Sequence, residues 1–194
     1  MRVLLIFCHP VEDSYNAALH RVAKAALERA GHAIDDCDLY AEGFDPVLSR
    51  QERLDYHDTA LNRRNAGLYV ERLLAAEALV LCFPVWNFGL PALLKGFFDR
   101  VFLPGVSFDL TDAGRIAPRL QHIRKLAAIT TYGCSRPVAW YLGDPPRRFC
   151  TRAIRPLMSP GAHVVYLAQY RMNVLTEAGR KRFLAKVERS MARF

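Results

Sequence analysis

The sequence lacks the cysteine and histidine spacings that mark a zinc site or a disulfide framework. Its five cysteines are an odd number, and none belongs to a C-x-x-C pair or stands at ligand spacing from a histidine. Three of them fall in apolar runs that resemble strands. We therefore expect buried, reduced thiols and no bound metal.

Long hydrophobic runs, internal repeats and low-complexity tracts are also missing. No segment approaches the roughly 20 apolar residues that a membrane-spanning helix needs. The first apolar run stops at His9, short of the core of a secretory signal, and no small-residue cleavage site follows it. We expect a cytoplasmic protein that does not cross a membrane, folded as one domain over residues 1–194.

Positive charge is scarce in the first half of the chain and concentrated in the second. The net charge is +8, yet residues 1–114 hold 11 Lys and Arg against 16 Asp and Glu. The sequence has no helix-turn-helix, RNP or zinc-finger pattern, and its basic residues stand singly rather than in an aromatic-rich stripe. We expect no nucleic-acid binding, whereas the charge suits any phosphate-bearing ligand.

Apolar runs alternate with amphipathic stretches along the chain. The runs predict strands at 2–8, 32–40, 77–83, 125–133 and 162–170. Helices are predicted after Asp13 or Ser14, at 65–77, from Pro91, at 147–157 and after Thr176, with a polar stretch at 41–64 and a hairpin-like excursion at 104–123. This order predicts an α/β protein with a five-stranded parallel sheet, doubly wound in the flavodoxin-like manner with helices on both faces.

The loop after the first strand, "HPVEDSYN", has neither of the common glycine-rich phosphate motifs. It ends at a predicted helix start, where free main-chain N–H groups favour a phosphate and where Ser14 and Asn16 add side-chain donors. His9 could also donate to a phosphate oxygen. Helix capping explains Asp13 or Ser14 equally well, so both interpretations stay open.

Two more strand ends have notable residues, "FPVWNFG" at 83–89 and "TTYGCS" at 130–135. Trp86 and Phe88 could be core residues, but a loop position favours a stacking wall. Thr130, Thr131 and Gly133 suit hydrogen bonding to a ring or a polyol chain, although a plain strand exit explains them nearly as well. Together the three loops predict a site with a phosphate end and a flat, apolar end, which is the shape of a flavin.

The sequence resembles the NAD(P)H:quinone oxidoreductases of the flavodoxin-like fold. Residues 83–108, "FPVWNFGLPALLKGFFDRVFLPGVSF", are similar to that family's F-P-x-x-W/x-x-x-P-A-x-L-K-G-x-x-D/E-R-V-F signature. "CHP", "SYNAAL" and "TTYG" stand in the family's order, and the similarity runs from Arg2 to about Leu167. The family includes quinone reductases, the modulator-of-drug-activity type and the ancillary subunits of glutathione-gated potassium efflux systems.

The resemblance implies a flavin-dependent enzyme that uses FAD, with FMN as the alternative, and NAD(P)H as co-substrate. In the family's ping-pong reaction a hydride passes from NAD(P)H to flavin N5, and two electrons then pass to a quinone or another small acceptor. The implied flavin contacts are His9, Ser14, Tyr15, Asn16 and Ala18 at the phosphate end; Pro84, Val85, Trp86, Asn87 and Phe88 beside the ring; and Thr130, Thr131, Tyr132 and Gly133 at the other edge of the ring.

The segment after Gly133 departs from the mammalian members, which have a Tyr and a His six residues apart. Here Tyr141 is followed six positions later by Arg147, within "YLGDPPRR", and that loop contains no histidine. Tyr141, Arg147 and Arg148 are therefore our candidates for catalytic residues that would stabilise the negative charge of the reduced flavin by different chemistry.

The resemblance further implies a homodimer, and the apolar excess around residues 90–108 suits a shared surface. Two other functions stay open. One is a cytoplasmic regulatory flavoprotein docked on a membrane transporter, a potassium efflux antiporter. The other is a flavodoxin-type electron carrier, which fits less well because flavodoxins have a T/S-x-T-G-x-T loop and an acidic surface, whereas this chain has a pI near 9.5. The sequence does not decide between FAD and FMN, between NADH and NADPH, or among acceptors.

Overall fold

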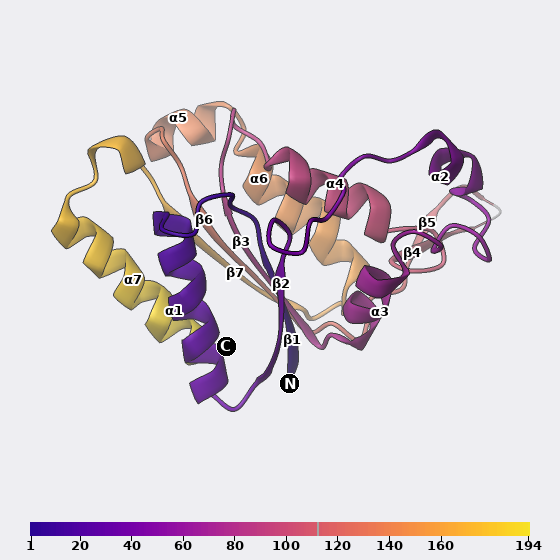
Figure 1. Ribbon diagram of the computed structural model, residues 1–194, viewed down its shortest axis with the longest axis horizontal. Helices are drawn as coiled ribbons and strands as arrows, with labels where there is room; N and C mark the ends of the chain where they lie inside the picture. The colour runs from indigo at the N-terminus through magenta and orange to yellow at the C-terminus, as the bar shows by residue number, and fades with distance from the viewer. Residues whose placement is uncertain (112) are drawn as a thin grey trace.

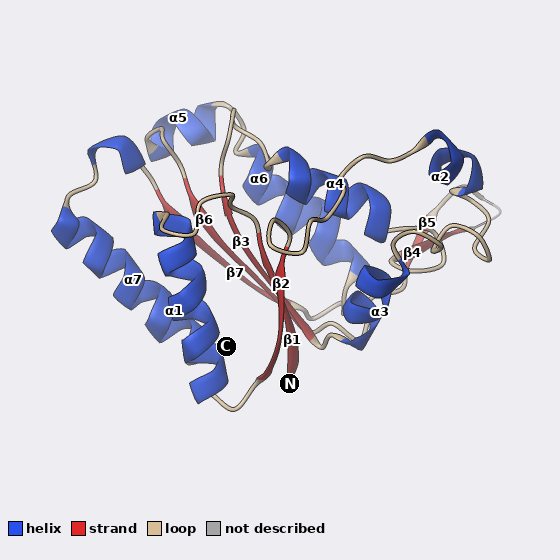
Figure 2. Ribbon diagram, viewed as in Figure 1, coloured by secondary structure: helices blue, strands red, loops and turns tan. Residues whose placement is uncertain are grey.

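A computed structural model describes residues 1–111 and 113–194 and contains one sheet of five parallel strands. The strands stand in the order β2-β1-β3-β6-β7. They span Arg2–Phe7 (β1), Ala33–Asp38 (β2), Ala78–Pro84 (β3), Lys125–Thr131 (β6) and His163–Gln169 (β7). Helices stand on both sides of the twisted sheet (Figures 1 and 2). The predicted doubly wound, flavodoxin-like α/β fold is confirmed.

Alternate residues of each strand pack into two separate cores. Val3 and Leu5 of β1 face the side covered by α1 (Tyr15–Arg29) and α7 (Glu177–Met191), whereas Leu4 and Ile6 face the other side. That second side is covered by α3 (Gly67–Ala75), α4 (Ala92–Val101) and the helical segment around α6 (Pro145–Arg148) (Figure 1). Burial on both faces is the reason that β1, β3 and β6 appear in the sequence as unbroken apolar runs.

Helix ends follow the sequence signals closely. Ser14, not Asp13, is the N-cap of α1, and its Oγ accepts a hydrogen bond from Ala17 N at 3.1 Å. Thr176 caps α7 in the same way through Gly179 N. Gly31, just beyond α1, has φ +81°, the left-handed conformation that ends many helices.

Three helical features differ from the prediction. The polar stretch 41–64 contains a short helix, α2 (Arg50–Asp55), and the Pro- and Arg-rich segment contains α5 (Arg136–Tyr141). The predicted helix at 147–157 consists of α6, a π-helix (Phe149–Ile154) and a 3-10 turn (Arg155–Leu157). Short helices rich in proline and helices with a changed hydrogen-bond step do not show the 3.6-residue period on which the prediction depends.

The excursion at 104–123 contains an antiparallel hairpin of β4 (Phe108–Leu110) and β5 (Ile116–Pro118). Elsewhere, after β7, a 3-10 turn spans Met172–Val174. The hairpin lies beyond the main sheet (Figure 2), and Phe108 of β4 lines a groove together with Arg53 of α2. Among the described residues, no helix combines the length and the apolar character that crossing a bilayer requires.

Candidate functional site

The loops that follow β1, β3 and β6 meet at the carboxyl edge of the sheet. These strands are neighbours, and Val85 N donates to Thr131 O at 2.8 Å. Asn16 Nδ2 donates to Thr131 Oγ1 at 3.0 Å, which links the first loop to the third. The rings of His9 and Trp86 lie 5.8 Å apart, which brings the first loop next to the second. The three segments chosen from the sequence therefore form one surface.

His9 is held in an orientation that leaves Nε2 available. His9 Nδ1 lies 3.0 Å from Val11 N and 3.2 Å from Val11 O, so the contacts within this loop use Nδ1, and Nε2 has no partner among the described residues. Neighbouring Cys8 belongs to the core, and burial raises the pKa of its thiol to about 12. Cys8 therefore stays protonated at neutral pH.

The start of α1 presents main-chain donors without partners. The N–H groups of Tyr15 and Asn16 have no hydrogen-bond partner among the described residues, and the positive end of the helix dipole lies at the same place. Ser14 Oγ accepts from Ala17 N but keeps its own hydroxyl proton. Capping and phosphate binding are therefore compatible at Ser14.

The side chains of the other α1 residues predicted at the phosphate end do not all act as donors to a ligand. The Asn16 side chain is buried and donates to Thr131, so only its main-chain N–H stays available to a ligand, contrary to the expected side-chain donor. The Tyr15 hydroxyl donates to Arg180 O at 2.9 Å and ties α1 to α7. Ala18 is half-buried in the first turn.

The aromatic turn at 86–89 is a tight two-residue turn with strained backbone. Trp86 N and Gly89 N each bond to the other residue's carbonyl oxygen, at 3.3 and 2.9 Å, and the two residues between have φ values of +47° (Asn87) and +61° (Phe88). Such turns prefer Asn or Gly, so Phe88 is a costly choice. Residues held in this conformation cluster at ligand-binding sites.

The exposure of the Trp86 and Phe88 rings decides whether they are core residues or form a stacking wall. Trp86 is 41% and Phe88 46% exposed, so neither ring belongs to the core. The N–H groups of Asn87 and Phe88 have no partner among the described residues. Behind them Pro84 is buried at the end of β3 and Val85 is half-buried. The turn therefore offers an aromatic surface with two main-chain donors beside it.

We expect Phe88→Gly to unfold at higher urea concentration than Phe88→Ala. Both substitutions remove the ring, but only glycine relieves the left-handed strain, by about 1 kcal/mol. Urea denaturation of the flavin-free variants measures the difference, and the same pair of substitutions at Leu90, which has negative φ, is the control. An alanine variant as stable as the glycine variant would contradict the strain assignment.

The end of β6 presents its main chain, whereas most of its side chains point inward. Thr130, Thr131 and Tyr132 are all buried, and Gly133 is exposed. The Tyr132 hydroxyl lies 2.6 Å from both Asp144 Oδ1 and the Tyr166 hydroxyl, away from the loop surface. The expected hydroxyl contacts from Thr130 and Thr131 to a ligand are therefore less direct than the sequence suggested.

Two buried polar atoms at this edge have no partner. Asn16 Oδ1 and Thr130 Oγ1 make no hydrogen bond among the described residues, although buried polar atoms normally do. One surface is therefore surrounded by three kinds of group. They are the unpaired N–H donors at 15–16 and 87–88, the two exposed aromatic rings, and these two unpartnered atoms. A planar ligand with a phosphate tail matches this donor set, so the residues present fit a flavin.

The three candidate catalytic residues lie on exposed segments after Gly133. Tyr141 ends α5 and is 83% exposed. Arg147 and Arg148 are also exposed, and the Arg147 guanidinium lies 5.4 Å from the centre of the Tyr166 ring. Since Tyr166 contacts Tyr132, Arg147 adjoins the third loop, whereas Tyr141 projects away from the protein surface.

The sequence prediction missed Asp144, which joins these segments. Burial and the hydrogen bonds of Asp144 and Tyr166 raise the pKa of Tyr132 well above its ordinary value, so its hydroxyl stays protonated. Asp144 also has φ +47°. The Gly-Asp pair before two prolines could have drawn attention to a turn here, but not to a contact with Tyr132.

Comparison with known proteins gives consistent results. Residues 1–144 match a family described as having a flavodoxin-like fold. The chain is 34% identical over 148 residues to NAD(P)H dehydrogenase [quinone] 1 of Cavia porcellus, covering 68% of this chain and 54% of that protein. The chain spans about half the length of the first curated relatives that it matches.

Solved structures extend the similarity over the whole chain. The crystal structure of Smu.1420 from Streptococcus mutans UA159 is 26% identical with a TM-score of 0.85, and each chain is covered completely. The NAD(P)H:quinone oxidoreductase from Methanothermobacter marburgensis shares the fold, with a TM-score of 0.83 at 24% identity, covering 99% of this chain and 94% of that chain.

Proposed function

Because this chain belongs to the flavodoxin-like family of NAD(P)H:quinone oxidoreductases, we propose that it transfers a hydride from NAD(P)H, through a bound flavin, to a quinone. The observation that most supports this is the meeting of three loops around an exposed aromatic turn, with unpaired main-chain N–H groups at 15–16 and 87–88. A flavin bound there supplies the two-electron redox chemistry.

Each group of residues has a definite task in this proposal. The start of α1 and His9 bind the flavin phosphate through N–H donors and the helix dipole. The turn at 86–89 orients the ring by stacking and by main-chain hydrogen bonds, and it excludes water from one face. The main chain at 131–133 holds the opposite edge of the ring. The protein therefore contributes position and electrostatics.

The direct test is to purify the protein, record its visible spectrum and identify the released flavin by chromatography. We propose FAD as the cofactor, with FMN as the alternative outcome. NADH and NADPH are then compared as donors, with 1,4-benzoquinone as acceptor. A colourless protein that gains no flavin absorbance with added FAD or FMN would overturn the proposal.

Arg147 and Arg148 are proposed to stabilise the negative charge that develops on the reduced flavin. Replacing both with Ala is expected to slow flavin reduction by NAD(P)H about tenfold, because two cations would no longer stabilise the developing negative charge. A tenfold slower rate corresponds to a loss of about 1.4 kcal/mol of transition-state stabilisation. Stopped-flow absorbance at saturating NAD(P)H measures this rate. Arg152→Ala, an exposed cation on the following π-helix, is the control. An unchanged rate would remove both arginines from the site.

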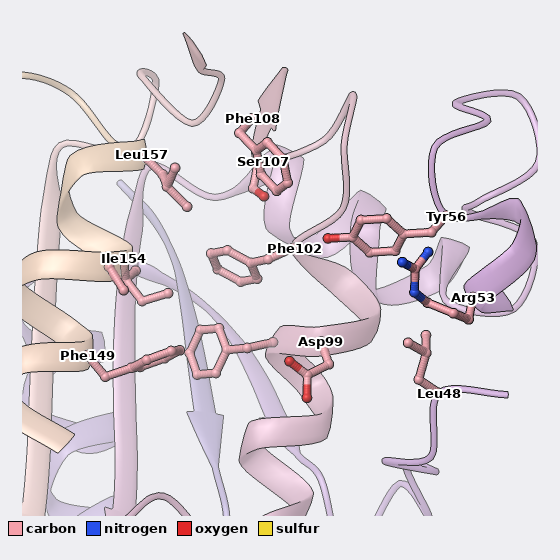
Figure 3. Close-up of a pocket in the computed structure, with 12 residues that line it drawn as sticks. Leu48, Arg53, Tyr56, Asp99, Phe102, Ser107, Phe108, Phe149, Ile154 and Leu157 are labelled. Carbon is pink, nitrogen blue, oxygen red and sulfur yellow. The ribbon is translucent and has the colours of Figure 1, made fainter. Parts of the chain in front are cut away.

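A second copy of the chain is the proposed partner, and the structure offers a surface for it. A groove of about 480 Å³ lies between α4, the π-helix, the start of β4 and the segment around α2, and Phe98 of α4 is part of its lining. Phe102, Phe108 and Phe149 gather on one side of it and Arg53 and Tyr56 lie on the other (Figure 3). Leu110 and Ile116 on the hairpin are exposed nearby. Sedimentation equilibrium tests the homodimer, which a purely monomeric protein at micromolar concentration would exclude.

Three expectations from the sequence stay predictions: a cytoplasmic location, docking on a potassium efflux antiporter, and one-electron transfer of the flavodoxin type. Co-purification with a transporter would favour the regulatory role. A stabilised semiquinone in a redox titration would favour the electron carrier. Brisk quinone turnover without either result would favour the enzyme.

A further inference from the structure

A small hollow lies beside the aromatic turn, between the loops that follow β3 and β6. It has a volume of about 270 Å³. Its lining consists of Gly89 and Leu90 from the loop after β3, Pro145 and Pro146 from α6, Lys95 from α4 and Phe149 from the start of the π-helix. Gly89 belongs to the turn that is proposed to hold the flavin ring, so the hollow adjoins the place of reaction.

Most side chains of the lining are hydrocarbon. Proline has no N–H, which removes two donors from one wall. The N–H of Gly89 is bonded to Trp86 O at 2.9 Å, and its carbonyl oxygen accepts from Trp86 N. The Lys95 ammonium, the one charged group of the described lining, donates one of its three hydrogens to Asp99 Oδ1 at 2.5 Å. A polar group placed against the Pro145, Pro146 and Phe149 side chains would lose its water without gaining hydrogen bonds from them, whereas a hydrocarbon would not.

The proline wall is fixed to the third loop by a directed chain of hydrogen bonds. Because an ionised carboxylate can only accept, Tyr132 donates to Asp144 Oδ1, and the Tyr132 oxygen accepts from the Tyr166 hydroxyl, each at 2.6 Å. Asp144 directly precedes Pro145 and is the N-cap of α6. Tyr132 follows Thr131, so the chain links the wall of the hollow to residues proposed to hold the flavin ring.

Phe149 also lines the hollow, and its ring packs against a neighbouring helix. Its ring packs edge-on against Phe98 of α4, with 4.8 Å between the ring centres and 71° between the planes. The π-helix begins at this residue, and such helices occur often at functional sites because they displace side chains from the regular helical position. The hollow is therefore built from fixed elements and adjoins the proposed site.

We propose that this hollow receives the hydrocarbon substituent of a quinone acceptor, and this inference depends on the proposed function. Pockets that take a whole drug-sized ligand measure about 300–1,000 Å³, so 270 Å³ suits part of a molecule. A quinone head that reacts at the flavin ring would place an alkyl or isoprenoid substituent beside Gly89. Each methylene buried there should raise affinity about fourfold.

The test compares two acceptors on the flavin-loaded protein, 1,4-benzoquinone and 2-decyl-1,4-benzoquinone. The wild type should have a KM at least tenfold lower for the decyl compound. Leu90→Asn and Pro145→Asp should lower kcat/KM for the decyl compound at least tenfold and change that for benzoquinone less than twofold. Pro145 is exposed, so its variant keeps the fold. Leu68→Asn, an exposed leucine on α3, is the control.

A second measurement separates the hollow from the reaction. Calorimetric titration with redox-inert 1,4-dimethoxy-2-decylbenzene should show binding to the wild type and at least tenfold weaker binding to Pro145→Asp. If the inert compound binds more weakly to Pro145→Asp but the protein reduces neither quinone, the proposed function is overturned and the hollow is supported as a hydrocarbon-binding site. Equal acceptor preference in the wild type and both variants, with equal binding of the inert compound, would overturn the inference while quinone turnover stands.

Discussion

Replacing Ser14 with Asp is expected to weaken flavin binding about 100-fold without destabilising the protein. Asp caps a helix as well as Ser does, so Ala17 N keeps its acceptor. The new carboxylate would lie at the proposed phosphate position. Two unit charges about 5 Å apart repel by about 3 kcal/mol at an effective dielectric constant of about 20, which corresponds to about two orders of magnitude in Kd.

The control for this substitution is Ser14→Asn, which is an equally good cap without charge. Flavin fluorescence titrations measure the two dissociation constants, and urea denaturation of the flavin-free variants checks the cap. The difference between the variants should shrink as salt is added, because ions screen the repulsion. Equal flavin affinity for the Asp and Asn variants would mean that Ser14 only caps α1.

Replacing Arg100 with Met is expected to cost about 3–5 kcal/mol of unfolding free energy, because it leaves Glu52 without its buried partner. Arg100 is 8% exposed, and its Nε and Nη2 donate to Glu52 Oε1 at 2.9 and 2.6 Å. A third donor, Nη1, reaches the main-chain oxygen of Asp45. The side chain therefore joins α4 to α2, a helix in which no residue is buried.

Urea denaturation measures the loss, and two further variants serve as references. The double variant Arg100→Met, Glu52→Leu should recover most of the stability, because both charges are then removed together. Lys95→Ala, which breaks an exposed ion pair on the same helix, should cost less than about 1 kcal/mol. A loss below 1 kcal/mol for Arg100→Met would show that water reaches the Glu52 carboxylate.

The same ion pair predicts a dependence on pH. Burial tends to raise the pKa of Glu52, but the hydrogen bonds from Ser49 and Arg100 outweigh it and hold the pKa below the ordinary value of 4.5. A carboxyl whose pKa is lowered by folding stabilises the protein above its unfolded pKa and loses that contribution as pH falls through the folded pKa. The deficit of Arg100→Met relative to the wild type should therefore shrink below about pH 4.5.

The strands and helix caps could be predicted because their causes are local. A parallel strand buried on both faces must be apolar at every position, so 2–8, 77–83 and 125–133 stood out. Ser14 and Thr176 cap helices through bonds to N–H groups three residues ahead. The meeting of the three loops followed from the order of the strands, since ligands bind at the carboxyl edge of such sheets.

The directions of individual side chains depended on contacts distant in sequence. Asn16 and Tyr132 were predicted to face a ligand, but they bond to Thr131 and Asp144 inside the protein. Gly96 is another example. A Cβ added there would lie 2.4 Å from Pro46, 50 residues earlier, so α4 could not pack against that segment with any larger residue. Neither neighbour is visible in a local sequence pattern.

The aromatic turn at 86–89 shows which properties of the site come from the sequence and which come from the tertiary structure. The fold class followed from composition and from the alternation of strands with helices. The location of the candidate site followed from the segments 9–16, 83–89 and 130–135. Only the tertiary structure decided that Trp86 and Phe88 are exposed, that the turn holds Phe88 in a left-handed conformation, and that Asp144 joins α6 to the third loop. The physical reason is that burial and strain arise from packing between distant segments, whereas residue type and period are properties of neighbours in the chain.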